Sequence, residues 1–69
     1  MTDFLVIYEP GPDGSWSARA ADLPVYAVGD TLDDAEQEIR GAIALHLQAL
    51  RERGQGPPER RSVLGSVSV

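Results

Sequence analysis

The sequence contains no cysteine, no lysine and no long apolar run. Without cysteine, a disulfide framework and a thiolate metal site are both excluded. No apolar stretch approaches the roughly 20 residues that a membrane-spanning helix needs, and the opening MTDFLVIYEP lacks the basic segment of a secretory signal. We therefore expect a cytoplasmic protein that contacts no membrane and uses no cofactor.

The sequence is also short. Its 69 residues allow one domain, spanning 1–69, with a thin hydrophobic core. Ordering the backbone costs about 1–2 kcal/mol per residue, and few apolar residues are present to offset that cost. Since disulfides are excluded, association of several copies is the remaining way to bury more apolar surface. The sequence therefore predicts a homo-oligomer.

Positive charge is scarce and unevenly placed. Eleven acidic residues stand against six arginines, which gives a formal net charge of -5. Residues 1–39 contain nine of the acids and only Arg19, whereas residues 40–69 contain five arginines and two acids. An acidic surface repels the phosphates of nucleic acid and attracts a basic protein. The alternative reading is a charge spread over the surface for solubility alone.

Three segments in the first half have the character of strands. Residues 3–9 are rich in β-branched and aromatic side chains and run into a cluster of turn formers, Glu9-Pro10-Gly11-Pro12-Asp13-Gly14. Residues 15–21 alternate between apolar and polar side chains, as a half-buried strand does. Asp22-Leu23-Pro24 interrupts this pattern, and a short strand is expected at 25–28. The first two strands should form an antiparallel hairpin.

A long amphipathic helix is predicted at 32–53. Thr31 is suited to cap its first turn, and Gly54 is a favourable residue just after its end. Acidic residues lie in the first turns and arginines lie near the end, which suits the helix dipole. The apolar residues recur at helical spacing and form one stripe that should cover a sheet. The stripe consists of Leu32, Ala35, Ile39, Ala42, Ile43, Leu47 and Leu50.

The last segment, 62–69, alternates valine with serine and is predicted to form a fourth strand. The order β-β-β-α-β then gives an α+β, two-layer sandwich with one helix on a four-stranded sheet. A crossover through the helix would place the last strand parallel to the first and beside it, in the order 3-2-1-4. Two sheet edges and one face would remain open for a partner.

No group of residues matches a catalytic or nucleotide-binding motif. His46, the only histidine, falls within the apolar stripe, so we expect it to pack rather than to act as a general base. The serines form no nucleophile elbow, and the glycines match no phosphate-binding fingerprint. Asp22, Asp30, Asp33 and Asp34 could gather around a cation, but turn, cap and dipole roles explain them more simply. We expect neither enzymatic activity nor a metal site.

A series of short motifs runs from Ala21 to Ala35 as A-D-L-P-V-Y-A-V-G-D-T-L-D-D-A, followed by Ile39-Arg40 and Ala42-Ile43. In order and spacing it resembles the HicB family of antitoxins. That family has an aromatic-rich first strand, a glycine-containing hairpin, a D-L-P-G turn, a G-D-T-x-x-E-A helix start, and an amphipathic helix that ends near glycine and prolines. The resemblance extends from Phe4 to Pro58.

The resemblance implies a partial ribonuclease-H-like or double-stranded-RNA-binding-like fold. It also implies a role as antitoxin to HicA, a small basic ribonuclease that cleaves messenger RNA, by covering that toxin. Val25 stands where the family usually has glycine, and Asp34 stands where it usually has glutamate. Many members carry a C-terminal DNA-binding region that has no counterpart here, so direct DNA binding is not expected.

The residues expected to bind a protein partner cluster around the Leu-Pro loop and the start of the helix. They are Asp22, Tyr26, Asp30, Asp33 and Glu36. Two alternatives to an antitoxin remain open: a stand-alone homo-oligomeric module that binds another protein, and a weak RNA-binding protein. The second alternative would use the arginines at and after the end of the helix. These are Arg51, Arg53, Arg60 and Arg61.

Overall fold

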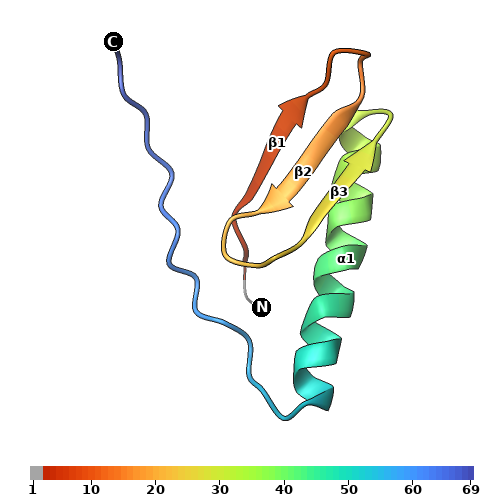
Figure 1. The fold of residues 1–69 in the computed structure, drawn as a ribbon, viewed down its shortest axis with the longest axis vertical. Helices are drawn as coiled ribbons and strands as arrows, with labels where there is room; N and C mark the ends of the chain where they lie inside the picture. Colours follow the sequence, from red (N-terminus) through yellow and green to blue (C-terminus); the bar gives the residue numbers. More distant parts are fainter. Residues whose placement is uncertain (1–2) are drawn as a thin grey trace.

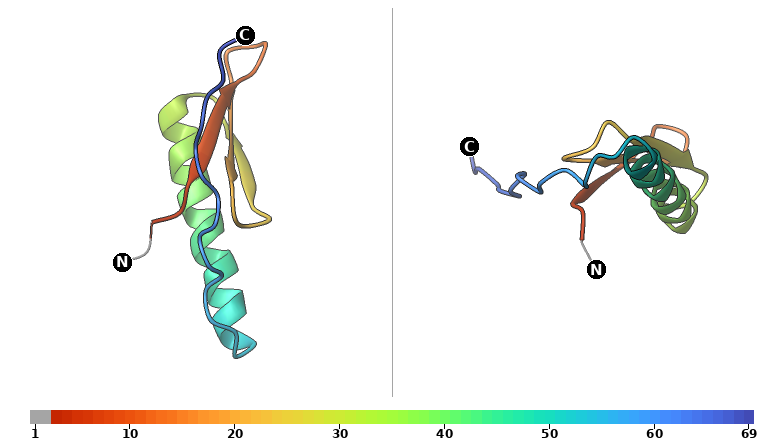
Figure 2. Two further views of the ribbon diagram at one scale, coloured as in Figure 1. Left: turned by 90° about the vertical axis from the view of Figure 1, so that its left-hand side faces the viewer. Right: turned by 90° about the horizontal axis from the view of Figure 1, so that it is seen from below.

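The computed structural model describes residues 3–69, in which a three-stranded antiparallel sheet is followed by one helix (Figure 1). The strands are β1 (Val6–Pro10), β2 (Trp16–Ala20) and β3 (Tyr26–Gly29), and the helix is α1 (Leu32–Glu52). In the sheet, β2 lies between β1 and β3. The helix covers one face of the sheet and leaves the other face open (Figure 2). The fold is of the α+β class.

A tight hairpin joins β1 to β2, as the sequence predicts. The two strands pair antiparallel along the whole of β1, from Val6 to Pro10. In the turn, Gly14 has a φ of +86°, a conformation that residues with a side chain rarely adopt. Asp13 accepts hydrogen bonds from the amide and the hydroxyl of Ser15 at 3.2 and 2.6 Å. These local bonds fix the turn and with it the register of the hairpin.

Both ends of α1 carry the caps that the sequence predicts. The hydroxyl of Thr31 accepts a hydrogen bond from the amide of Asp34 at 3.1 Å. At the other end, Gly54 has a φ of +75°, and the amide of Gln55 donates to the carbonyl of Leu50 at 2.9 Å. This pattern is a Schellman motif, which satisfies carbonyls that the helix leaves free. The helix ends one residue before its predicted end.

The helix lies over β3 and β2 and covers β1 less. Its first turn approaches β3 closely at Gly29, where an added Cβ would lie 2.7 Å from the carbonyl carbon of Asp34. The 21 residues of α1 rise about 31 Å, whereas a five-residue strand spans only about 17 Å. The second half of the helix therefore projects beyond the sheet, as Figure 1 shows.

The core is small, as the length of the chain predicts. Ala18, Ala35 and Ile39 form its centre, and none of them is more than 2% exposed. Trp16 and Tyr8 are partly buried against this centre. The later residues of the predicted apolar stripe are only half-buried, because they lie toward the part of the helix that passes the end of the sheet.

The fourth strand predicted at 62–69 is wrong. Residues 55–69 follow an extended path beside the sheet and pair with no strand in the part of the chain that the structure describes. The sheet has three strands in the order β1-β2-β3, not four in the order 3-2-1-4, and β1 is an open edge. The alternating pattern shows that the segment can form a strand, but a strand also needs an edge within reach. Apart from the amide of Gln55, which caps α1, the hydrogen bonds of this tail to the described body of the chain come from Arg60 and Ser62, so no hydrogen bond directs the residues after them onto β1.

Candidate protein-binding surface

The five residues predicted to bind a partner are divided by β3. Asp22 lies before this strand and Asp30 lies after it, so the two residues are at opposite ends of β3. Tyr26, the first residue of β3, is 75% exposed on the sheet face that α1 leaves open. Asp33 and Glu36 are exposed in the first turns of α1. The structure thus brings together only part of the predicted set.

Asp22 is engaged by the tail of its own chain. Its Oδ1 accepts hydrogen bonds from the hydroxyl and the amide of Ser62 at 2.6 and 2.9 Å. The hydroxyl bond is the main cause that lowers the pKa of Asp22 below its ordinary value, because it stabilises the charged form. Close by, Arg60 donates to the carbonyl of Asp3 at 2.9 Å. Asp22 therefore holds the beginning of the tail against the sheet rather than facing outward.

Glu36 lies on the side of the helix that faces β1. It forms an ion pair with Arg40, one turn further along, at 2.7 Å. Both residues line a groove of about 620 Å³ between β1 and α1. The apolar side chains of this β1–α1 groove are Phe4, Val6, Tyr8, Ile39, Ile43, Ala44 and Leu47. Glu36 therefore belongs to a different surface from Asp30.

A second hollow lies on the opposite side of α1, beside the end of β3. Asp30, Asp34 and Glu38 line it together with Val28, and its volume is about 260 Å³. Val28 is 57% exposed and Tyr26, two residues earlier on the same strand, is 75% exposed. We call these five residues the acidic surface. In the described part of the chain, none of the ion pairs involves its three carboxylates.

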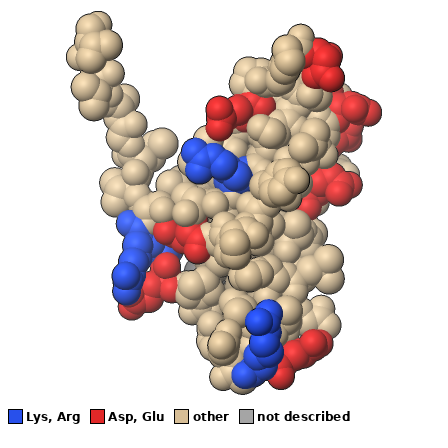
Figure 3. Space-filling model, in the orientation of Figure 1, with Lys and Arg blue, Asp and Glu red and all other residues tan. Residues whose placement is uncertain are grey.

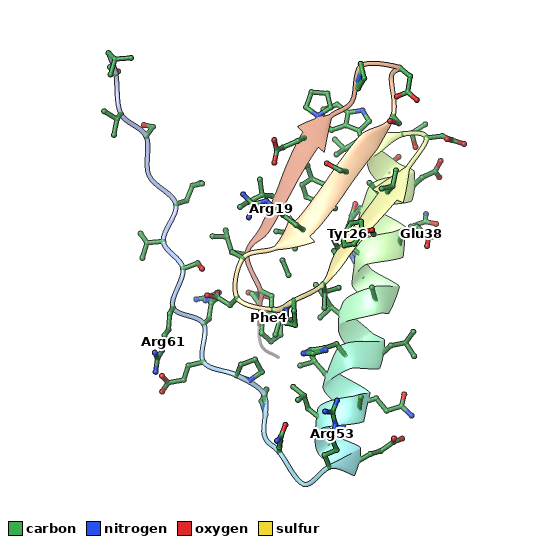
Figure 4. The ribbon with its side chains drawn as sticks, in the orientation of Figure 1. Phe4, Arg19, Tyr26, Glu38, Arg53 and Arg61 are labelled. Carbon is green, nitrogen blue, oxygen red and sulfur yellow. The ribbon has the colours of Figure 1, made fainter. Side chains whose placement is uncertain are left out.

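Sequence reasoning assigned Asp34 to the helix cap and passed over Glu38. The sequence does contain a signal that Asp34 and Glu38 share one side of α1, because residues four apart on a helix lie on the same face. Figure 4 shows Glu38 projecting from α1 beside β3. In Figure 3, acidic side chains follow the margin formed by β3 and the beginning of α1, and no basic side chain lies among them in that view. The acidic surface is thus a region of one charge sign with exposed apolar side chains next to it.

The arginines of the second half form no comparable patch. Arg53 donates to a backbone carbonyl of α1 at 3.4 Å, Arg60 donates to another carbonyl, and Arg61 pairs with Glu59 at 3.3 Å. Figure 4 shows Arg53 at the end of α1 and Arg61 on the tail, well separated. Backbone phosphates are bound by several cations on one face. Within residues 3–69, these arginines do not form a face of that kind.

Residues 3–69 contain neither a candidate metal site nor a helix that could span a membrane. No group of three or more histidine, aspartate or glutamate side chains in this range is placed to hold a metal ion. His46 is half-buried on α1, and the ion pairs of the same range leave it without a carboxylate partner. Nor does this range contain a helix with the length and apolar character needed to cross a membrane.

Comparison with known proteins gives no family assignment, because no protein-family model, curated protein or solved structure matches the chain significantly. The resemblance to HicB antitoxins therefore stays a prediction that depends on the order and spacing of the motifs.

Proposed function

We propose that this protein is a HicB-like antitoxin, a cytoplasmic binding module that covers a small, basic, RNA-cleaving toxin of the HicA type. The motif order from Ala21 to Ala35 supports this proposal. The observation that carries it is the acidic surface, where three carboxylates without an ion-pair partner among the described residues lie beside exposed apolar side chains. Such a module needs no cofactor and catalyses no reaction, and direct binding of DNA is not part of its action.

The chemistry of the acidic surface suits a ribonuclease partner. A toxin that binds RNA presents cations at the positions where phosphates bind, and carboxylates at matching positions attract and orient it. Tyr26 and Val28 would supply the apolar contact that becomes dry in the complex, and tyrosine is typical of such interface centres. Occupying the RNA-binding surface of the toxin is then sufficient to inhibit it.

Co-expression tests the proposal. The chain is produced together with the small basic protein encoded beside it, the complex is isolated by pull-down, and growth of the cells is measured. We expect a complex and rescue of growth from the toxin. If a complex is absent and growth is not restored, the antitoxin proposal is wrong.

Charge-matched variants locate the contact. The triple variant Asp30→Asn, Asp34→Asn and Glu38→Gln removes three charges from the acidic surface and should weaken binding about 10- to 100-fold. A control variant removes three charges elsewhere, at Asp13, Glu52 and Glu59, by the same amide replacements and should retain binding. Equal weakening by both variants would show that overall charge, and not this surface, determines the affinity.

A second candidate is a stand-alone homo-oligomeric module that binds some other protein. The exposed apolar side chains of the tail favour it, since Val63, Leu64 and Val67 are 90%, 77% and 88% exposed. Exposed apolar side chains in one segment are typical of a surface that a partner covers. Absence of a neighbouring basic gene together with a stable homo-oligomer in solution would favour this candidate over the first.

A further inference from the structure

We propose that the tail of one chain, residues 64–69, adds a strand to the open edge of β1 in a second copy, and that two chains exchange tails in this way. The three-stranded sheet of each chain remains as described, and the added strand comes from the other molecule. This inference gives the second candidate function its interface. It does not depend on the antitoxin proposal, because the acidic surface lies on the other side of α1 from the β1–α1 groove.

The acceptor is the backbone of β1. The carbonyl of Leu5, just before this strand, accepts a hydrogen bond from the amide of Ala21 at 2.9 Å, and the amide of Gly11, just after it, donates to the carbonyl of Ser15 at 2.7 Å. In an antiparallel pair, alternate residues point their backbone groups to alternate sides. The odd-numbered residues of β1 therefore face β2, whereas Val6 and Tyr8 present their amides and carbonyls to the open edge. An added strand would satisfy these groups.

The β1–α1 groove lies under the same edge. Val6 and Tyr8 line it from β1, and Ile39, Ile43 and Leu47 line it from α1. The groove exists because the helix lies over β2 and β3 and leaves β1 partly uncovered. Apolar side chains of an added strand would fill it and extend the thin core, with a gain of about 25 cal/mol for each Å² of apolar surface removed from water.

The donor has the matching pattern. Val67 and Val69 lie on one side of an extended segment, and Ser66 and Ser68 lie on the other. Residues 62–69 contain no charged side chain, so no ionised side chain of this segment would enter the apolar groove. Paired with β1, the valines would point into the groove and the serines would point to the open sheet face, where water reaches them.

The tail leads away from its own β1. Its beginning is held by the bonds of Ser62 to Asp22 and of Arg60 to the carbonyl of Asp3. Beyond these hydrogen bonds the chain passes Gly65, which has open space around it, and Figure 1 and the right-hand view of Figure 2 show the remainder diverging from the sheet. A segment that is fixed at its base and projects outward is placed to reach another molecule, and the same arrangement in that molecule makes the exchange symmetric.

The area of the chain agrees with this arrangement. Its accessible surface is 5446 Å² at 7.4 kDa, whereas a compact monomer of that mass exposes about 4,200 Å². Its radius of gyration is 13.5 Å, against about 11 Å for a compact chain of this length. The excess of about 1,200 Å² in each of two chains is enough to supply a stable interface, which buries about 1,200–2,000 Å² in total.

Light scattering on the full chain over a range of concentrations is the first test, and we expect the mass of a dimer.

The double variant Val67→Glu and Val69→Glu should raise the dimer dissociation constant at least about tenfold, because it would place carboxylates in the apolar groove. The control Ser66→Glu and Ser68→Glu adds the same charge to the opposite side of the strand and should remain dimeric. Val67 is 88% exposed in the single chain, so circular dichroism should show an unchanged fold. A monomeric parent chain, or equal behaviour of the two variants, overturns the proposal.

Cysteine pairing distinguishes exchange from folding back, because the natural sequence has no cysteine. The variant with Val6→Cys and Val67→Cys is oxidised, and we expect a covalent dimer in which the thiol introduced at position 6 of one chain is joined to the thiol introduced at position 67 of the other. Val6→Cys combined with Ser68→Cys, which faces the other side, is the control and should cross-link less. A disulfide within one chain, or none at all, overturns the exchange. A dimer that fails to bind the toxin would refute the antitoxin proposal alone.

Discussion

At Gly29 the sheet comes close to the first turn of the helix. A Cβ at this position would lie 2.8 Å from the Cβ of Asp34 and 2.7 Å from its carbonyl carbon, and closer still to the amide of Ala35. Two of these three neighbours are backbone atoms of the first turn of α1, which cannot turn aside as a long side chain can. Gly29 therefore fixes how near α1 can approach β3, and so how Asp34 is placed beside Asp30.

The variant Gly29→Ala should lower the free energy of unfolding by about 1–3 kcal/mol, because the added methyl forces the helix away from β3. Gly41→Ala is the control. Gly41 lies in the middle of the exposed side of α1 with nothing near the added Cβ, so this change should raise the free energy of unfolding by up to about 1 kcal/mol. Urea denaturation followed by circular dichroism measures both. Similar effects for the two variants would contradict the close approach.

The bond between Asp22 and Ser62 should make the attachment of the tail depend on pH. The hydroxyl of Ser62 lowers the pKa of Asp22 in the folded chain below the value of about 3.9 expected when unfolded. A lowered pKa means that the stabilisation is present above the unfolded value and is lost as the pH falls through the folded value. The amide resonance of Ser62 should therefore change below about pH 3.9, and Asp22→Asn should abolish that titration. A Ser62 resonance that does not respond to acid would show that the hydrogen bonds between Ser62 and Asp22 do not form in solution.

At the scale of elements, the hairpin and the helix were predictable because their signals are local. The turn needs Asp13 and Gly14, and the ends of α1 need Thr31 and Gly54, all of which act on backbone groups a few residues away. The tail carries an equally clear strand pattern, yet it is unpaired. The alternation of side chains shows only that the segment is able to form a strand. Whether it does so also depends on the edge of a sheet, formed by residues far away in the sequence, with which it can pair.

The candidate site was predicted incompletely for a related reason. Asp22 and Asp30 are close in the sequence, but β3 lies between them, and a strand advances about 3.3 Å per residue. The two carboxyls are thereby carried to opposite ends of the sheet. Asp34 and Glu38 are brought beside Val28 by the packing of α1 on β3, which no local signal specifies. Tertiary packing, and not composition, decides which acids share a surface.

Thr31 offers a direct test of the local signals. Thr31→Ala removes the hydroxyl that accepts from the amide of Asp34 and should cost about 1 kcal/mol of stability. Thr31→Ser keeps an accepting hydroxyl and should restore most of the loss. Thermal unfolding followed at the helical signal of circular dichroism compares the three chains. If serine were no better than alanine, the hydroxyl would not be what starts the helix.

At the scale of the whole molecule, the thin core determines how the protein responds to change. Its centre contains two alanines and one larger side chain, Ile39. Small domains have a free energy of unfolding of about 0.05–0.15 kcal/mol per residue, or about 3–10 kcal/mol for a chain of this length. One well-placed apolar side chain therefore accounts for a large share of the total.

Ile39→Ala should remove about 2–5 kcal/mol, because it deletes the largest side chain at the centre of the core. Leu45→Ala deletes a side chain of similar size from the same helix, but Leu45 is 69% exposed, and its loss should change stability by less than about 0.5 kcal/mol. Urea denaturation of both variants measures the difference. Ile39 also lines the β1–α1 groove, so if a second chain covers that groove, the denaturation midpoint of the unmodified protein should rise with its concentration. Equal costs for the two substitutions would show that the contact between α1 and the sheet does not determine the stability of the fold. A midpoint independent of concentration would show that no second chain covers the groove.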